Sequence, residues 1–218
     1  MLTRPTLKPE LIPAEHWNTP SWIDQHRFES AAQKLKHQGV QYATLESYHQ
    51  MCRWNSGLFY HHPALANTRY YWRVEPNVHF FCDVDYDVFR YLQDNNKTYG
   101  FTISLYDDPK TVATLWPETE KFLAASADKG YLAENNALGW LTDGSRRPDH
   151  MEKAHGYSTC HFWSNFEVAD MDFWRKPAYE EYFKHLDQAG GFFYERWGDA
   201  PVHSIALGLF EDKSRIHW

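Results

Sequence analysis

The fold is indicated most strongly by YGFTISL at residues 99–105, where aromatic and β-branched residues favour a strand. A similar composition predicts strands at residues 70–74 and 78–84, and a short one at 192–194. Helices are predicted over residues 26–38, 45–60, 85–93, 111–126, 177–188 and 201–209. The most loop-like stretch is residues 139–156. Strands that alternate with helices indicate an α/β domain.

Length and charge restrict the class of protein. The chain has 218 residues, enough for one large domain, and a formal net charge of −7. Because an acidic chain is repelled by a phosphate backbone, we expect no nucleic-acid partner. Aromatic residues make up 17% of the chain and include 10 Trp, which predicts either a large aromatic core or flat surfaces that stack on a ligand ring.

Several catalytic classes are excluded by missing motifs. The sequence holds no Walker loop, no Gly-x-Gly-x-x-Gly and no Gly-x-Ser-x-Gly, which argues against a P-loop NTPase, a simple Rossmann dehydrogenase and a serine hydrolase. The 13 His residues show no zinc-ligand spacing, so we expect structural histidines. We also expect Cys52, Cys82 and Cys160 to be buried, small apolar residues.

Two groups of acids lie at the ends of predicted strands. Glu75-Pro76-Asn77 ends the strand at 70–74, and in an extended chain Glu75 and Asn77 face the same side. Their oxygens would suit a hard divalent cation that holds a diphosphate, although a solvated Glu in a turn is the alternative. Asp83 and Asp85 have Asp-x-Asp metal spacing, but we prefer Asp85 as the N-cap of the next helix.

Three further acids are candidates for chemistry. Asp107 follows the strand at 99–105, at the end where α/β sheets gather ligands, or it is a turn acid before proline. Glu167 ends the aromatic run CHFWSNFE, where a desolvated carboxylate can act as nucleophile or acid/base, or cap a helix. Asp199 precedes an apolar helix, so it is either a cap or a functional residue.

Five segments occur in an order that characterises one family. They read MCRWNSG at 51–57, YWRVEP at 71–76, YGFTIS at 99–104, CHFWSNFE at 160–167 and GGFFYERWGDAPVHS at 190–204. With them, residues 15–218 closely resemble the fungal α-1,2-mannosyltransferases of the Kre2/Mnt1 type, glycosyltransferase family 15. The last two segments are too long and too rare in composition to match by chance.

The resemblance implies both a fold and a reaction. The fold would be α/β and GT-A-like, a nucleotide-sugar transferase fold with a mixed central sheet. The donor would be GDP-mannose, the acceptor a mannose-terminated N- or O-linked glycan, and the cofactor Mn²⁺, with retention of the α-anomeric configuration. The whole enzyme would be a membrane protein on the lumenal side of the Golgi.

Roles for single residues also come from the resemblance. Glu75, with Arg73 and Asn77 beside it, matches the motif of the donor and metal region, which makes Glu75 the expected metal ligand. Asn77 stands where the family usually has Gly or Asp, and a neutral amide binds a metal less well than a carboxylate. Glu167 matches the proposed nucleophile, and Tyr48 matches a tyrosine between donor and acceptor.

Asp107 and Asp199 match acidic positions that line the sugar sites. Glu167 would either attack the anomeric carbon or stabilise positive charge on it. We therefore predict that Glu75 and Glu167 converge in one cleft around a sugar diphosphate.

The same resemblance predicts a partial catalytic domain over residues 1–218, with the first strands, the stem, the membrane anchor and a C-terminal histidine segment of the family lying outside it. Such a domain would have an incomplete sheet with a long exposed edge, and we expect the isolated chain to be poorly stable. No run of about 18 apolar residues predicts a membrane-spanning helix here. The alternative functions are an inactive relative that binds glycans or joins a complex and, with least support, a hydrolase using Glu75 or Glu167.

Overall fold

A four-stranded mixed sheet forms the centre of the structure, a computed structural model that describes residues 8–218. The strand order is β1 (Tyr70–Val74), β5 (Phe166–Asp170), β2 (Tyr99–Phe101) and β6 (Ile216–His217). β5 pairs antiparallel with both β1 and β2, whereas β2 and β6 are parallel. The mixed central sheet expected from the sequence is therefore confirmed.

The stretch YGFTISL contributes to two sheets rather than to one strand. β2 ends at Phe101, and β3 (Ser104–Tyr106) pairs with β4 (Cys160–Phe162) in a separate two-stranded sheet. The chain changes its pairing partner between the two, and there the carbonyl of Ile103 accepts the N–H of Trp163. The prediction of one strand over 99–105 is wrong, because a strand extends only as far as a neighbouring strand pairs with it. Here β2 pairs with β5 and β6, whereas β3 pairs with β4.

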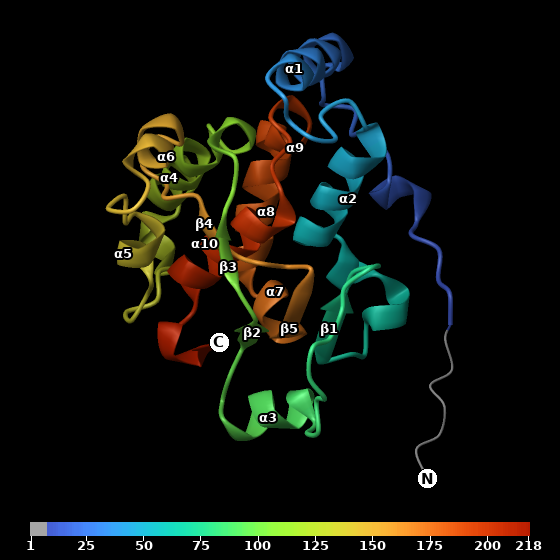
Figure 1. Ribbon diagram of the computed structural model, residues 1–218, viewed down its shortest axis with the longest axis vertical. Coiled ribbons are helices and arrows are strands. Elements are labelled where there is room, and N and C mark those ends of the chain that lie inside the picture. Colours follow the sequence, from blue (N-terminus) through green and yellow to red (C-terminus); the bar gives the residue numbers. More distant parts are fainter. Residues whose placement is uncertain (1–7) are drawn as a thin grey trace.

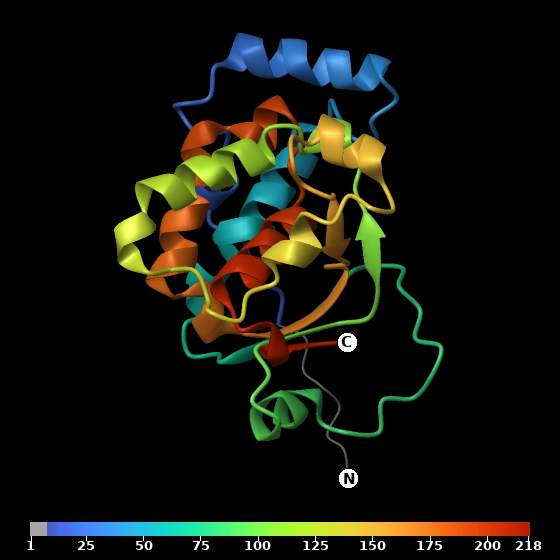
Figure 2. The same ribbon diagram turned by 90° about the vertical axis from the view of Figure 1, so that its left-hand side faces the viewer.

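The predicted strands at 78–84 and 192–194 are also wrong. Residues 78–84 loop away from the body between β1 and α3 (Figure 2), and the Phe81 side chain is 98% exposed. β-Propensity produces no strand where no neighbour supplies backbone partners. Residues 192–194 lie in the short helix α9 (Gly191–Tyr194), where Gly191 packs against Trp197 so closely that a Cβ would lie 2.0 Å from its ring.

The predicted helices are present within a few residues of their expected ends. They are α1 (Gln25–His37), α2 (Glu46–Gly57), α3 (Val88–Asp94), α4 (Leu115–Ala125), α8 (Pro177–Ala189) and α10 (Asp199–Phe210). Figure 1 shows α1 and α3 at opposite ends of the molecule. Asp87, not Asp85, caps α3, because its carboxylate accepts the N–H groups of Phe89 and Arg90.

Several short elements were not predicted. The stretch at 139–156, expected to be a loop, includes most of α5 (Leu138–Leu141) and all of α6 (Pro148–Lys153), and α7 (Met171–Trp174) follows β5 directly. Single 3₁₀ turns occur at Ala14–His16, Phe59–His61, Pro63–Leu65, Pro109–Thr111, Ala127–Lys129 and Lys213–Arg215. Elements this short carry too little periodicity to be recognised.

α10 runs through the core and packs against β4, α2, α5 and α8 (Figure 2). From Pro201 to Phe210 every residue of this helix is buried, as expected for a helix that is apolar on all sides. The aromatic residues mainly build this core, since Trp174, Trp197, Tyr99 and Tyr179 are fully buried. Among residues 8–218, no helix has the length and apolar character needed to cross a bilayer.

The cysteines differ from one another in burial. Cys52 is buried and Cys160 is partly buried, but Cys82 is exposed on the loop before α3. The expectation of a buried thiol is therefore wrong for Cys82, because Phe80 of this loop packs against Trp72 and Phe166 whereas Phe81 and Cys82 stay exposed.

Candidate active site

Arg73 and Glu167 lie directly opposite each other on the antiparallel strands β1 and β5. The next row on the same face contains Tyr71, Ala169 and Tyr99, because residues two apart in a strand face the same side. α10 contacts this face through its first turns, where Asp199 and His203 reach the sheet. The sheet and α10 thus bring polar residues from four elements together.

Glu167 is held in the interior by two tyrosine hydroxyls and a histidine ring nitrogen, with its side chain 1% exposed. Its Oε1 accepts from the Tyr71 hydroxyl at 2.8 Å, and its Oε2 accepts from the Tyr99 hydroxyl at 2.9 Å and lies 3.1 Å from His203 Nδ1. Burial raises the pKa of Glu167, but His203 and Arg73 outweigh it and hold this pKa below its usual value. Glu167 is therefore a carboxylate at neutral pH.

Arg73 is the centre around which the acids gather. Its Nη2 lies 2.6 Å from Glu75 Oε1, and its Nη1 lies 2.5 Å from Asp199 Oδ2. The Ser164 hydroxyl donates to the same Asp199 oxygen at 2.7 Å. Burial raises the pKa of Asp199, yet Arg73 more than offsets it, so the pKa of Asp199 is also lowered. One guanidinium thus compensates carboxylates that would otherwise repel each other.

The four charged residues lie at increasing depth. The exposed fraction of the side chain falls from 31% for Glu75 to 14% for Arg73, 8% for Asp199 and 1% for Glu167. A ligand that approaches from solvent therefore meets Glu75 first. The structure brings Glu75 and Glu167 to the same region through Arg73.

Asn77 departs from the expected arrangement. The chain turns at Pro76 and Asn77, and Asn77 is exposed with φ of 63°. The extended geometry that would present Glu75 and Asn77 side by side on one face of a strand is thus absent. A left-handed φ is adopted most easily by glycine and next by asparagine, which accounts for the residue type at this position.

Tyr48 of α2 and Asp107 adjoin the cluster. Asp107 follows β3, and its Oδ2 would lie 3.7 Å from a Cβ built on Gly198, which places Asp107 beside the start of α10. Burial, with smaller contributions from Asp199 and Asp107, raises the pKa of Tyr48 to about 12. Tyr48 is therefore a neutral phenol that can donate a hydrogen bond.

Asp199 is not a helix cap, although a cap was one of its two expected roles. Gly198 occupies the N-cap of α10, and the Asp199 carboxylate binds Arg73 and Ser164 instead. Arg196, close by, has φ of 70° and its guanidinium lies 5.4 Å from the Tyr48 ring centroid.

Sequence reasoning missed His203, Tyr71, Tyr99 and Ser164. Two signals could have indicated them. Asp199 and His203 are four residues apart, so they share one face once the helix predicted at 201–209 is extended to Asp199, and Tyr71 and Arg73, two apart in a predicted strand, face the same side. His203 was assigned a structural role because local sequence does not show which buried carboxylate it would meet.

The cluster offers one clear candidate metal ligand, the carboxylate of Glu75. Within residues 8–218, no group of three or more His, Cys, Asp or Glu side chains forms a cluster that could hold a metal ion. The partly exposed Glu75 carboxylate fits as a single oxygen ligand of a hard cation, with other ligands coming from a bound diphosphate.

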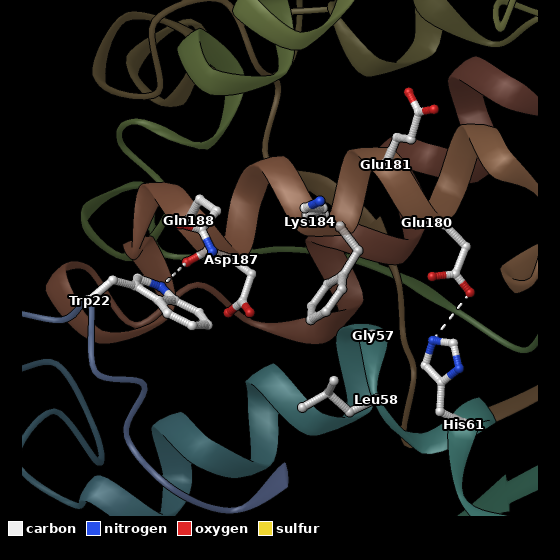
Figure 3. Close-up of a pocket in the computed structure, with 10 residues that line it drawn as sticks. Trp22, Gly57, Leu58, His61, Glu180, Glu181, Lys184, Asp187 and Gln188 are labelled. Carbon is white, nitrogen blue, oxygen red and sulfur yellow. Dashed lines mark hydrogen bonds and ion pairs between the residues drawn. The ribbon is translucent and has the colours of Figure 1, made fainter. Parts of the chain in front are cut away.

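A separate pocket of about 330 Å³ lies between the end of α2 and α8 (Figure 3). Its lining includes Trp22, Leu58, Phe183 and the contact of His61 with Glu180, whose Nε2 and Oε1 are 3.2 Å apart. None of the predicted site residues lines it. This pocket is distinct from the acid cluster.

Comparison with known proteins identifies relatives over nearly the whole chain. The chain is 50% identical over 207 residues to the probable mannosyltransferase KTR4 of Saccharomyces cerevisiae, covering 95% of this chain and 44% of that protein. It is also 50% identical over 207 residues to glycolipid 2-alpha-mannosyltransferase 2 of Candida albicans, with 95% and 43% coverage. The chain thus spans less than half the length of these two relatives.

Two solved structures share the fold. Core-mannan synthase A (CmsA/Ktr4) from Aspergillus fumigatus, in its Mn/GDP form, has a TM-score of 0.93 and 66% identity, covering 95% of this chain and 55% of that one. Ktr4p from S. cerevisiae in complex with GDP has a TM-score of 0.92 and 50% identity, covering 95% and 52%. The GT-A-like fold inferred from the resemblance is confirmed, and this chain holds a part of it.

A family model described as glycolipid 2-alpha-mannosyltransferase matches residues 2–218. The expected resemblance is confirmed, and the chain belongs to glycosyltransferase family 15.

Proposed function

We propose that the protein is part of a retaining α-1,2-mannosyltransferase that moves mannose from GDP-mannose to a mannose residue of an N- or O-linked glycan. The observation that carries this proposal is the cluster of Glu75, Asp199 and Glu167 around Arg73, which extends from solvent into the sheet. Relatives named as mannosyltransferases, and related structures in complex with GDP, support this class of reaction. Nothing in residues 8–218 favours the inactive glycan-binding alternative.

The outer end of the cluster suits the diphosphate of the donor. Glu75 would hold a divalent cation such as Mn²⁺ through its partly exposed carboxylate. When bound, that cation would offset negative charge on the departing GDP. Arg73, one residue deeper in the cluster, adds a fixed positive charge for the same purpose.

The inner end suits the developing positive charge on the sugar. Retention requires either a carboxylate nucleophile or an internal return on the same face. Glu167 is ionised, but its three hydrogen bonds each contribute about 1.5–3 kcal/mol when they involve a charged group, and attack on carbon would disrupt them. We therefore favour Glu167 as the residue that stabilises positive charge at the anomeric carbon.

Tyr48 and Asp107 would contact the sugars. Tyr48 is a neutral donor with a partly exposed ring, and aromatic rings suit the apolar face of a sugar. Asp107 is partly exposed beside Gly198 and can accept from sugar hydroxyls. Asp199 would act through Arg73, since its carboxylate already has two partners.

The test is transfer of radiolabelled mannose from GDP-mannose to methyl α-mannoside with Mn²⁺. We would assay the natural full-length protein and its Glu167→Gln variant, with Glu152→Gln on the exposed side of α6 as the matched control. The proposal expects transfer by the natural protein and by the control, and strong loss in Glu167→Gln. Undiminished transfer in Glu167→Gln would remove Glu167 from the reaction, and no transfer by the natural protein would reject the proposed function.

The location of the enzyme follows from the same family likeness. We propose the lumenal side of the Golgi membrane, where mannose is added to glycans.

A further inference from the structure

His203 is buried in the core of the site, with its side chain 1% exposed. Its Nε2 lies 3.0 Å from the backbone carbonyl of Asn55 in α2, and its Nδ1 lies 3.1 Å from Glu167 Oε2. A carbonyl oxygen can only accept, so Nε2 must carry a proton. Nε2 is therefore protonated, and only the proton between Nδ1 and Glu167 remains to be placed.

The contact between Nδ1 and Glu167 must also hold one proton. A lone pair on Nδ1 facing a carboxylate oxygen would repel it, so the proton lies either on the imidazole or on the carboxyl group. The hydroxyls of Tyr71 and Tyr99 both donate to Glu167, and donors to a carboxylate favour its ionised form. The proton is therefore on His203.

The remaining charged neighbours agree with this assignment. Glu167 faces Arg73 from β1, which favours the carboxylate, and Asp199 from α10, which opposes the Glu167 charge but attracts a positive charge on His203. On the other side, the ring of Trp174 stacks on His203 with 4.2 Å between centroids. The face of an aromatic ring is electron-rich, so it favours a cation over a neutral imidazole.

We propose that His203, protonated on both ring nitrogens, is the positioning residue that keeps Glu167 ionised and correctly oriented for transfer. The inference rests on the proposed function, in which Glu167 carries the negative charge that faces the sugar. His203 joins α10 to α2 through Asn55 and to β5 through Glu167, so one ring fixes the carboxylate relative to two other elements.

His49 provides a matched comparison within the same chain. It is fully buried on α2, and its two ring nitrogens face the backbone carbonyls of Phe192 and Ala43 at 2.7 and 2.8 Å. Two carbonyl partners also call for two ring protons, but unlike a carboxylate they supply no negative charge, and burial lowers the pKa of His49. Comparison of His203 with His49 thus isolates the effect of the carboxylate partner.

The direct test is nuclear magnetic resonance of the natural full-length enzyme labelled with ¹⁵N in histidine and ¹³C at the glutamate carboxyls. At pH 7 we expect two ring N–H protons on His203 and an ionised Glu167 carboxyl. A single ring proton, or a protonated Glu167, would overturn the proposal.

The second test is the variant His203→Asn in the natural full-length enzyme. Asparagine can still donate to Glu167 but has no charge, so the Glu167 carboxyl should titrate at higher pH than in the wild type. We expect kcat about 100-fold lower, as for loss of one preorganised electrostatic contact, with KM for GDP-mannose changed less than about twofold. The acidic limb of the kcat–pH profile should also move to higher pH.

His49→Asn is the control for damage to the core. It should lower the melting temperature as His203→Asn does and leave the acidic limb at its wild-type position. If the two variants have the same pH profile, His203 has only a structural role and the proposal fails. If the wild-type enzyme transfers no mannose, the proposed function fails, while the magnetic resonance experiment still decides the protonation of the pair.

Discussion

Arg73 of β1 and Asp199 of α10 form an ion pair, with 2.5 Å between Nη1 and Oδ2, although they lie 126 positions apart in the sequence. The pair fastens the first turn of the buried helix α10 to the edge strand β1. Because Arg73 also holds Glu75 and lies opposite Glu167, one interaction organises both the fold and the candidate site.

Replacing Arg73 by Met should destabilise the protein by about 3–5 kcal/mol, because it leaves buried carboxylates uncompensated. Urea unfolding followed by tryptophan fluorescence gives the free energy of unfolding. Arg90→Met is the control, since Arg90 forms an exposed pair with Asp94 within α3, and such pairs contribute about 0.3–0.5 kcal/mol. Equal losses in the two variants would show that Arg73 does not compensate a buried charge.

Stability should fall at acid pH through Glu167 and Asp199. Both have a pKa that is lower in the folded protein than in the unfolded chain. Their contribution is therefore complete above the unfolded-state values of about 4 and is lost as the pH falls through the lower folded-state values. Urea unfolding at a series of pH values measures this.

The variant Asp199→Asn tests how much of this acid dependence comes from the Asp199 carboxyl group. It removes a titrating group whose pKa is lowered, so the free energy of unfolding should depend less steeply on pH below about 4 than in the wild type. An unchanged slope would mean that Asp199 does not contribute to the acid dependence.

Tyr48→Phe should leave the fold intact and slow the transfer. The ring of Tyr48 stacks on Tyr42 with 4.6 Å between centroids, and phenylalanine keeps that contact. Loss of a neutral hydroxyl that donates to a sugar should reduce kcat/KM about 10-fold, equivalent to one hydrogen bond. Tyr42→Phe, at the exposed partner ring, is the control and should retain wild-type kcat/KM, and an equal loss in both variants would contradict a role for the Tyr48 hydroxyl.

Gly191→Ala should destabilise the protein by about 1–3 kcal/mol, because the added alanine Cβ would collide with the Trp197 ring. Gly139→Ala in α5 is the control, since nothing lies within 4 Å of a Cβ there and alanine favours a helix by up to about 1 kcal/mol. Thermal unfolding compares the two. Wild-type stability in Gly191→Ala would contradict the packing of α9 against Trp197.

Local signals predicted the helices well and the strands unevenly. α8 begins with Pro177 and is followed by Gly190, whose φ is 78°, and both features are readable in the sequence. β1 ends just before Glu75-Pro76 as expected. By contrast, residues 78–84 have strand composition but no sheet partner, and YGFTISL divides between two sheets. A helix supplies its own hydrogen bonds, whereas a strand depends on another segment.

The sequence by itself determined the α/β class, the six longer helices to within a few residues of their ends and, through its motifs, the family and the candidate acids Glu75, Glu167, Asp107 and Asp199. Only the tertiary structure decided that Arg73 would bind two of these acids and that His203 would hold a third. The physical reason is that a buried charge is stabilised by whichever partners folding brings within about 3 Å. For Glu167 and His203 those partners are 36 positions apart, and no local pattern records that they will meet.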